Sequence, residues 1–133
     1  MNPRYAEVAL RAGHRCEYCH APEAVFNLPL EVEHITPVSR GGIDAEANWA
    51  LACRSCNLHK ASHLSGIDPE SQAEIRLFLP RDDRWEHHFQ VDGESGRMEG
   101  RTPIGRGTVA RLQINSEAQV AARRQWMRLG LFP

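Results

Sequence analysis

The sequence predicts an α+β fold around a metal-bound centre, and three observations support that prediction. Four cysteines form two matched CxxC pairs, two short strand candidates lie between these pairs, and proline and glycine mark the ends of several short helices. The chain has 133 residues, of which 41% are hydrophobic, and this suits one domain with a modest core. We therefore expect a single domain over residues 1–133, in which residues 67–133 pack on a core formed by residues 1–66.

The first expected element is a short helix that leads into the first cysteine pair. Asn2 is a candidate cap, Pro3 suits the first helical position, and Gly13 is a stop signal. Its apolar face is formed by Tyr5, Val8, Ala9 and Ala12. This helix should end just before the cysteines begin.

The four cysteines have the spacing of two zinc knuckles. Each pair can present two thiolates from one tight turn, and four thiolates complete a closed tetrahedral site. Such a zinc ion is structural, because no coordination position stays open. Four cysteines could also form disulfides in a secreted protein, but the charged N-terminus offers no export signal. The predicted zinc ligands are Cys16, Cys19, Cys53 and Cys56.

The segment between the cysteine pairs, His20 to Ala52, is 33 residues long and has room for two strands. The strand candidates are residues 30–35 and 49–52, joined by a loop that contains Pro37, Gly41 and Gly42. A short helix is expected to start near Asn57. The order is therefore strand, loop, strand and helix.

The second half of the chain is expected to hold a hairpin and two helices. A short strand over residues 77–79 should end at Pro80, and a DGESG turn should join the two arms of the hairpin, residues 84–91 and 97–99. Thr102 can cap a helix that runs towards Leu112. Ser116 can cap a last helix, which Gly130 would end.

Composition limits the class of protein. The formal net charge of −1 argues against nucleic-acid binding by bulk positive charge, although residues 97–133 hold seven arginines and only two glutamates. These arginines could meet a polyanion, or they could be the solvated faces of helices. No run of about 20 apolar residues and no signal peptide is present, so the sequence predicts a cytoplasmic protein without a membrane partner.

Two segments, VEHITPVSRGG and AEANWALACRSCNLHKA, resemble the HNH nucleases, whose fold is the ββα-metal (His-Me finger) fold. The match consists of the pair Glu33-His34, a glycine-rich loop, Asn48 fourteen residues after His34, and Asn57 nine residues after Asn48. The signature residues are thus His34, Asn48 and Asn57, which makes this the H-N-N variant of the family pattern. The segments GIDPES, LFLPRDDRWEHHF and GRTPIGRGTVARLQIN look like those of small stand-alone bacterial HNH proteins, so the resemblance extends over nearly the whole chain.

The resemblance implies a catalytic set of four residues. His34 would be the general base for water, because an unperturbed histidine has a pKa of about 6.5. Glu33 and Asn57 would hold one catalytic Mg²⁺ or Mn²⁺, since both offer hard oxygen ligands. Asn48 would brace the loop between the strands through backbone hydrogen bonds and so fix the ring of His34. Glu31 is expected to be an ordinary exposed residue.

Three further residues are expected to contact nucleic acid. Lys60 lies three residues after Asn57 on the same helical face, Arg40 lies at the tip of the loop, and His59 lies beside the expected site. The expected activity is a hydrolase that nicks DNA with weak sequence preference. A zinc-stabilised nucleic-acid-binding or interaction module without cleavage is the alternative. RNA as substrate, and monomer against homodimer, stay open.

Overall fold

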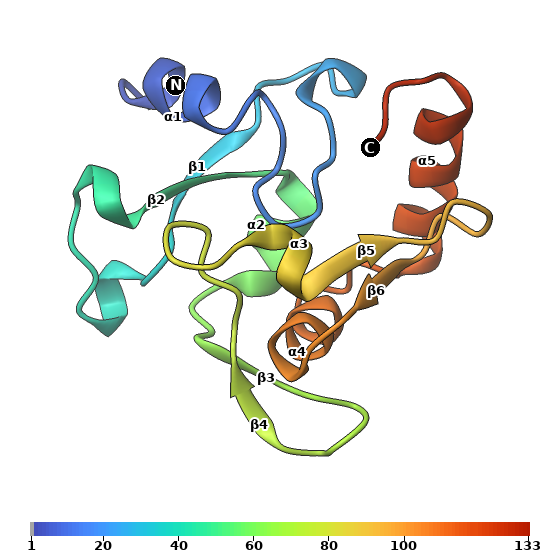
Figure 1. Cartoon of the computed structure of the whole chain (residues 1–133). Helices are drawn as coiled ribbons and strands as arrows, with labels where there is room; N and C mark the ends of the chain where they lie inside the picture. The colour runs from blue at the N-terminus through green and yellow to red at the C-terminus, as the bar shows by residue number, and fades with distance from the viewer. Residues whose placement is uncertain (1) are drawn as a thin grey trace.

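The computed structural model describes residues 2–133 and confirms the α+β fold (Figure 1). Within these residues the strands form three separate two-stranded antiparallel sheets, and helices lie before, between and after them. No helix in the described part of the chain is long and apolar enough to cross a membrane. Each small sheet has too few strands to be stable alone, so the fold depends on packing between elements.

The first sheet and the helix after it form the expected strand, strand and helix unit. Strand β1 (Glu31–His34) pairs with β2 (Trp49–Ala52), and His34 lies opposite Trp49. All four residues of β2 are buried. Helix α2 (Arg54–Lys60) follows β2 after a single residue and contacts β1. This places the residues of α2 over one face of β1.

Helix α2 begins earlier than the sequence predicts. The prediction of a start near Asn57 is wrong by three residues, because the second cysteine pair itself forms the first turn. Cys53 is the N-cap, and its Sγ accepts a hydrogen bond from the backbone N–H of Cys56 at 3.4 Å. Helix α1 (Tyr5–Arg11) starts two residues after Pro3, where Asn2 Oδ1 accepts from the Arg4 backbone N–H at 2.7 Å. It packs against β1 and β2.

The prediction of a strand over residues 77–79 is wrong. The strand lies three residues earlier, where β4 (Glu74–Arg76) pairs with β3 (Ser65–Ile67). Leu77 and Phe78 are instead buried in the core, and the backbone N–H of Phe78 donates to Thr108 Oγ1 at 2.9 Å. A side-chain hydroxyl thus satisfies the backbone group that a neighbouring strand would otherwise have satisfied.

The remaining hairpin is shorter than expected because residues 85–88 of its expected first arm form helix α3 (Trp85–His88). Strands β5 (Phe89–Val91) and β6 (Met98–Gly100) then pair as predicted. Helix α4 (Pro103–Arg111) packs on β6 and on the β3–β4 hairpin. Helix α4 also approaches α3 closely: a Cβ atom on Gly105 would lie 2.0 Å from the carbonyl oxygen of His88, so only glycine fits there.

The predicted helix caps in the C-terminal part are confirmed. Thr102 Oγ1 accepts from the backbone N–H of Gly105 at 3.0 Å at the start of α4. Ser116 Oγ accepts from the backbone N–H of Gln119 at the start of α5 (Glu117–Arg128), which lies beside the β5–β6 hairpin (Figure 1). The side chain of Arg123 is buried and donates to the backbone oxygens of Gly96 and Ile114, which ties α5 to that hairpin.

Candidate metal centres and active-site pocket

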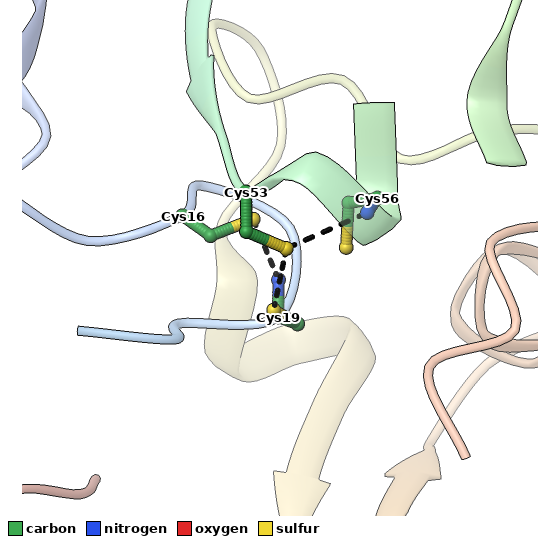
Figure 2. A group of neighbouring side chains, drawn as sticks. All are labelled: Cys16, Cys19, Cys53 and Cys56. Carbon is green, nitrogen blue, oxygen red and sulfur yellow. Dashed lines mark hydrogen bonds between the residues drawn. The ribbon is translucent and has the colours of Figure 1, made fainter. Parts of the chain in front are cut away.

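The four cysteines meet in one buried cluster. Figure 2 shows the first pair on the loop that follows α1 and the second pair at the start of α2. All four sulfur atoms lie within 4.8 Å of one another, and every one of these residues is buried. The backbone N–H groups of Cys19 and Cys56 also point at the sulfurs of Cys16 and Cys53 (Figure 2). The expected zinc ligands are thus brought together.

The geometry of the cluster fits a zinc ion. Sulfurs placed about 2.3 Å from a common tetrahedral centre lie about 3.8 Å from one another. The sulfurs of Cys19 and Cys53 are 3.7 Å apart. Hydrogen bonds from Cys16, Cys19 and Cys56 lower the pKa of the Cys53 thiol, whereas hydrogen bonding and burial raise the pKa of Cys19 and Cys56. A soft cation bound to all four sulfurs suits this thiol-rich, buried position.

A second candidate centre is a pocket at the end of β1. It brings together three residues of the expected catalytic set, Glu33, His34 and Asn57. The other residues that line it are Val32, Pro37, Val38 and Ala61. One strand and one helix therefore place a carboxylate, an imidazole and an amide around the same space.

The side chain of Glu33 is almost fully buried on the face of β1 that meets α2. Its Oε1 accepts a hydrogen bond from the Tyr18 hydroxyl, and its Oε2 lies 3.1 Å from the Lys60 ammonium. Burial raises the pKa of Glu33, although the charge of Lys60 and the hydrogen bond from Tyr18 act in the opposite direction. Each carboxylate oxygen keeps further lone pairs, so Glu33 can serve as a ligand to a hard cation only while sharing its charge with Lys60.

Lys60 is not placed to contact a phosphate. Its side chain is 2% exposed, and Nζ donates to Glu33, to the carbonyl of His34 and to the carbonyl of Ile35. An ammonium group has three N–H donors, so all of them have partners. Lys60 instead neutralises Glu33 and fixes the backbone where β1 ends. This corrects the expectation drawn from its position on the helix.

His34 lies at the rim of the pocket, with 35% of its side chain exposed. Its Nε2 is 2.9 Å from Oδ1 of Asp44, in the loop between β1 and β2. Hydrogen bonds from His34 and from Trp49 lower the pKa of Asp44. Nδ1 of the same ring is left for another partner. Sequence reasoning did not identify Asp44 as the partner of this ring.

Asn48 is buried and makes three hydrogen bonds to the backbone of the loop. Its Oδ1 accepts from the Thr36 N–H at 2.8 Å, and its Nδ2 donates to the carbonyls of Thr36 at 2.9 Å and of Ile43 at 2.7 Å. These contacts join the two ends of the loop that follows His34. Asn48 does not line the pocket formed by the other three residues of the set.

Asn57 contacts a residue that was expected to have no special role. Its Nδ2 donates to Oε1 of Glu31 at 2.9 Å, and Arg54 pairs with the other oxygen of Glu31 at 3.1 Å. Glu31 and Glu33 share a face of β1 because alternate residues of a strand point the same way. The alternation was the signal that could have identified Glu31. With its amide nitrogen engaged, Asn57 can turn its oxygen towards a cation.

The two other expected nucleic-acid contacts differ in their surroundings. Arg40 is exposed in a short 3₁₀ turn (Val38–Arg40) between β1 and β2. His59 is half-buried on α2, and its Nδ1 lies 2.8 Å from the carbonyl of Ser55. Arg40 is therefore free to approach a ligand, whereas the ring of His59 is held by its own helix.

Comparison with known protein families gives a match in the first half of the chain. Residues 16–63 match the family model described as HNH endonuclease, and this range contains the cysteine cluster, both strands of the first sheet and α2. No curated protein and no solved structure matches the chain.

Proposed function

We propose that the protein is a metal-dependent nuclease that nicks DNA with weak sequence preference, because residues 16–63 match the family model described as HNH endonuclease. The observation that carries the proposal is the pocket that Glu33, His34 and Asn57 line together. Hydrolysis of a phosphodiester needs a base for water, hard ligands for a divalent ion and a way to hold the phosphate. This pocket offers the first two.

His34 is the proposed general base. Its Nε2 contacts Asp44, so Nδ1 is the atom that can take a proton from water. The water oxygen forms a bond to phosphorus as the bond to the 3′ oxygen breaks, which leaves a 3′ hydroxyl and a 5′ phosphate. The exposure of His34 at the pocket rim gives a bulky polymer access to the ring.

Glu33 and Asn57 are the proposed ligands of the catalytic ion. A bound Mg²⁺ or Mn²⁺ would stabilise negative charge on the phosphate and on the leaving oxygen. Carboxylate and amide oxygens are the ligand types that such ions prefer. Arg40, which is exposed on the loop next to the pocket, is the proposed phosphate contact.

One observation favours the alternative, a zinc-stabilised nucleic-acid-binding module that does not cleave. Glu33 already has partners on both oxygens, Tyr18 and Lys60. Recruitment of Glu33 to a divalent ion must therefore compete with, or share, the Lys60 pair. Binding of nucleic acid that is unaffected by Mg²⁺, without cleavage, would distinguish this module from the nuclease.

The test is nicking of supercoiled plasmid by the purified protein with Mg²⁺ or Mn²⁺. We expect relaxed circles with either ion and none with EDTA. His34→Ala should lower the rate at least a hundredfold, the lower end of typical general-base contributions of about 10²–10⁴. His87→Ala is the matched control, because His87 is exposed in α3 outside the pocket.

Two results would overturn the proposal. One is equal nicking by His34→Ala and the unmodified protein. The other is intact plasmid under every metal, followed by intact RNA and branched DNA in the same assay.

A further inference from the structure

Asp44 links the two residues that face each other at the end of the first sheet. Its Oδ1 is 2.9 Å from His34 Nε2 and accepts from Trp49 Nε1 at 3.0 Å. His34 and Trp49 are opposite one another in the pairing of β1 with β2. The indole N–H can only donate, so it directs this carboxylate oxygen into the space next to the imidazole.

The position of Asp44 is fixed from its neighbours, although its side chain is 78% exposed. Asn48 holds the carbonyl of the preceding residue, Ile43, and also both backbone groups of Thr36. Trp49 is itself buried, and the Arg4 guanidinium lies 5.6 Å from the centre of its ring. Asn48 therefore holds the backbone that carries Asp44, and Asp44 in turn contacts His34.

From these contacts we propose that Asp44 is a positioning residue for His34: it orients the imidazole and keeps the proton on Nε2, so that Nδ1 is the free base. This inference rests on the proposed nuclease function. A neutral imidazole carries its proton on either nitrogen, and the partner of one nitrogen decides which. Only the form with Nδ1 unprotonated can accept a proton from water at that atom.

Among the charged groups near His34, Asp44 is the carboxylate that contacts its ring. Glu33 is its chain neighbour but pairs with Lys60, whose ammonium also binds the His34 carbonyl oxygen. Arg4 approaches from the start of α1 and lowers the pKa of Asp44, with a smaller effect than the hydrogen bond from His34. Removal of the Asp44 side chain should therefore leave Nε2 of His34 without its carboxylate partner.

The first measurement is the ¹⁵N NMR spectrum of the histidine rings at about pH 8, where an ordinary histidine is neutral. The signals of His34 are identified by their loss in His34→Ala. We expect His34 to be protonated at Nε2 in the unmodified protein and to be a mixture of both forms in Asp44→Ala. Asp82→Ala is the matched control, because Asp82 is an exposed aspartate outside the pocket. An unchanged His34 signal in Asp44→Ala overturns the proposal.

The second measurement is the kinetics of nicking at a single pH. For Asp44→Ala we expect kcat to fall about tenfold to hundredfold, less than the effect of a buried partner because this pair is exposed, with KM nearly unchanged. Asp44→Asn, which keeps an oxygen that can accept from Nε2, should show a smaller fall in kcat. Equal kcat values for all three proteins would contradict the inference.

The two measurements separate failure of this inference from failure of the proposed function. The ring signal needs no turnover, so it decides the role of Asp44 even for a protein that does not cleave. Zinc content and the melting temperature of each variant show whether the fold is intact. If Asp44→Ala loses zinc, both measurements would be made on Asp44→Asn, which preserves an oxygen for the contact with Trp49.

Discussion

The cysteine cluster and the pocket at the end of β1 differ in nearly every physical respect, although each suits a metal ion. The cluster has four identical ligands, all buried, with their sulfurs within 4.8 Å of one another. The pocket has three different groups, of which Glu33 is buried and ion-paired while His34 is one-third exposed. A structural site is complete without substrate, whereas a catalytic site must keep positions open for water and phosphate.

The two centres are connected through helix α2. Cys53 and Cys56 start α2, and the next residue of that helix is Asn57, which lines the pocket. Metal–ligand geometry tolerates small errors only, so an ion bound by the four cysteines would fix the start of α2 and with it the position of Asn57 over β1. We therefore expect the cysteine cluster to support the geometry of the pocket.

The largest expected effect comes from breaking the closed centre. Cys53→Ala should abolish the native fold along with any activity, because structural zinc contributes about 10–16 kcal/mol in small domains and total stability is usually about 5–15 kcal/mol. Zinc content by metal analysis and far-UV circular dichroism measure this. Ser55→Ala is the control in the same turn of α2. A folded and active Cys53→Ala protein would show that the cluster does not support the pocket.

The parts of the molecule that the sequence predicts well are those set by short-range patterns. The CxxC spacing predicts the cluster, proline and hydroxyl residues predict the start of α4 and α5, and the β5–β6 hairpin follows from its turn. In each case the deciding residues lie a few positions apart or carry a specific ligand chemistry. Their local contacts form in much the same way whatever the rest of the chain does.

The contacts within the pocket depend on long-range partners and were not predictable in the same way. Glu33 is held by Tyr18, fifteen residues before it, and by Lys60, twenty-seven residues after it. The expectation that Lys60 contacts a phosphate rested on its spacing from Asn57. That spacing places both residues on one face of the helix, but it does not show that this face packs on Glu33. The contact of Glu31 with Asn57 likewise joins residues that are distant in the sequence.

A smaller effect is expected from breaking the buried pair of the pocket. Lys60→Met leaves Glu33 buried without a counter-charge, and loss of one partner of such a pair costs about 3–5 kcal/mol. Urea unfolding measures the change. The double variant Glu33→Gln with Lys60→Met should recover part of the loss. An equal loss in the single and double variants would mean that the ion pair does not matter.

The loss of stability in Lys60→Met is expected to depend on pH. Burial raises the pKa of Glu33, and Lys60 opposes this, so the pKa rises further in Lys60→Met. A folded-state pKa above the unfolded value makes stability fall as pH rises between the two. The deficit of Lys60→Met should therefore be smallest below about pH 4.3, the ordinary glutamate pKa, and grow towards neutral pH. A deficit that is constant from pH 4 to 8 would exclude this origin.

The smallest expected effect tests whether Glu31 belongs to the pocket or only to the surface. Glu31 pairs with Arg54, which is 79% exposed, and such a pair contributes about 0–1 kcal/mol, so Glu31→Ala should unfold at nearly the same urea concentration. It also holds the Nδ2 of Asn57. Activity should therefore fall several-fold, at Mg²⁺ concentrations that saturate the unmodified protein, and recover as Mg²⁺ is increased. Arg54→Ala keeps Glu31 and is the matched control. If both variants nick plasmid at the unmodified rate across the Mg²⁺ titration, Asn57 needs no help from Glu31, and the open centre is held from the Lys60 side alone.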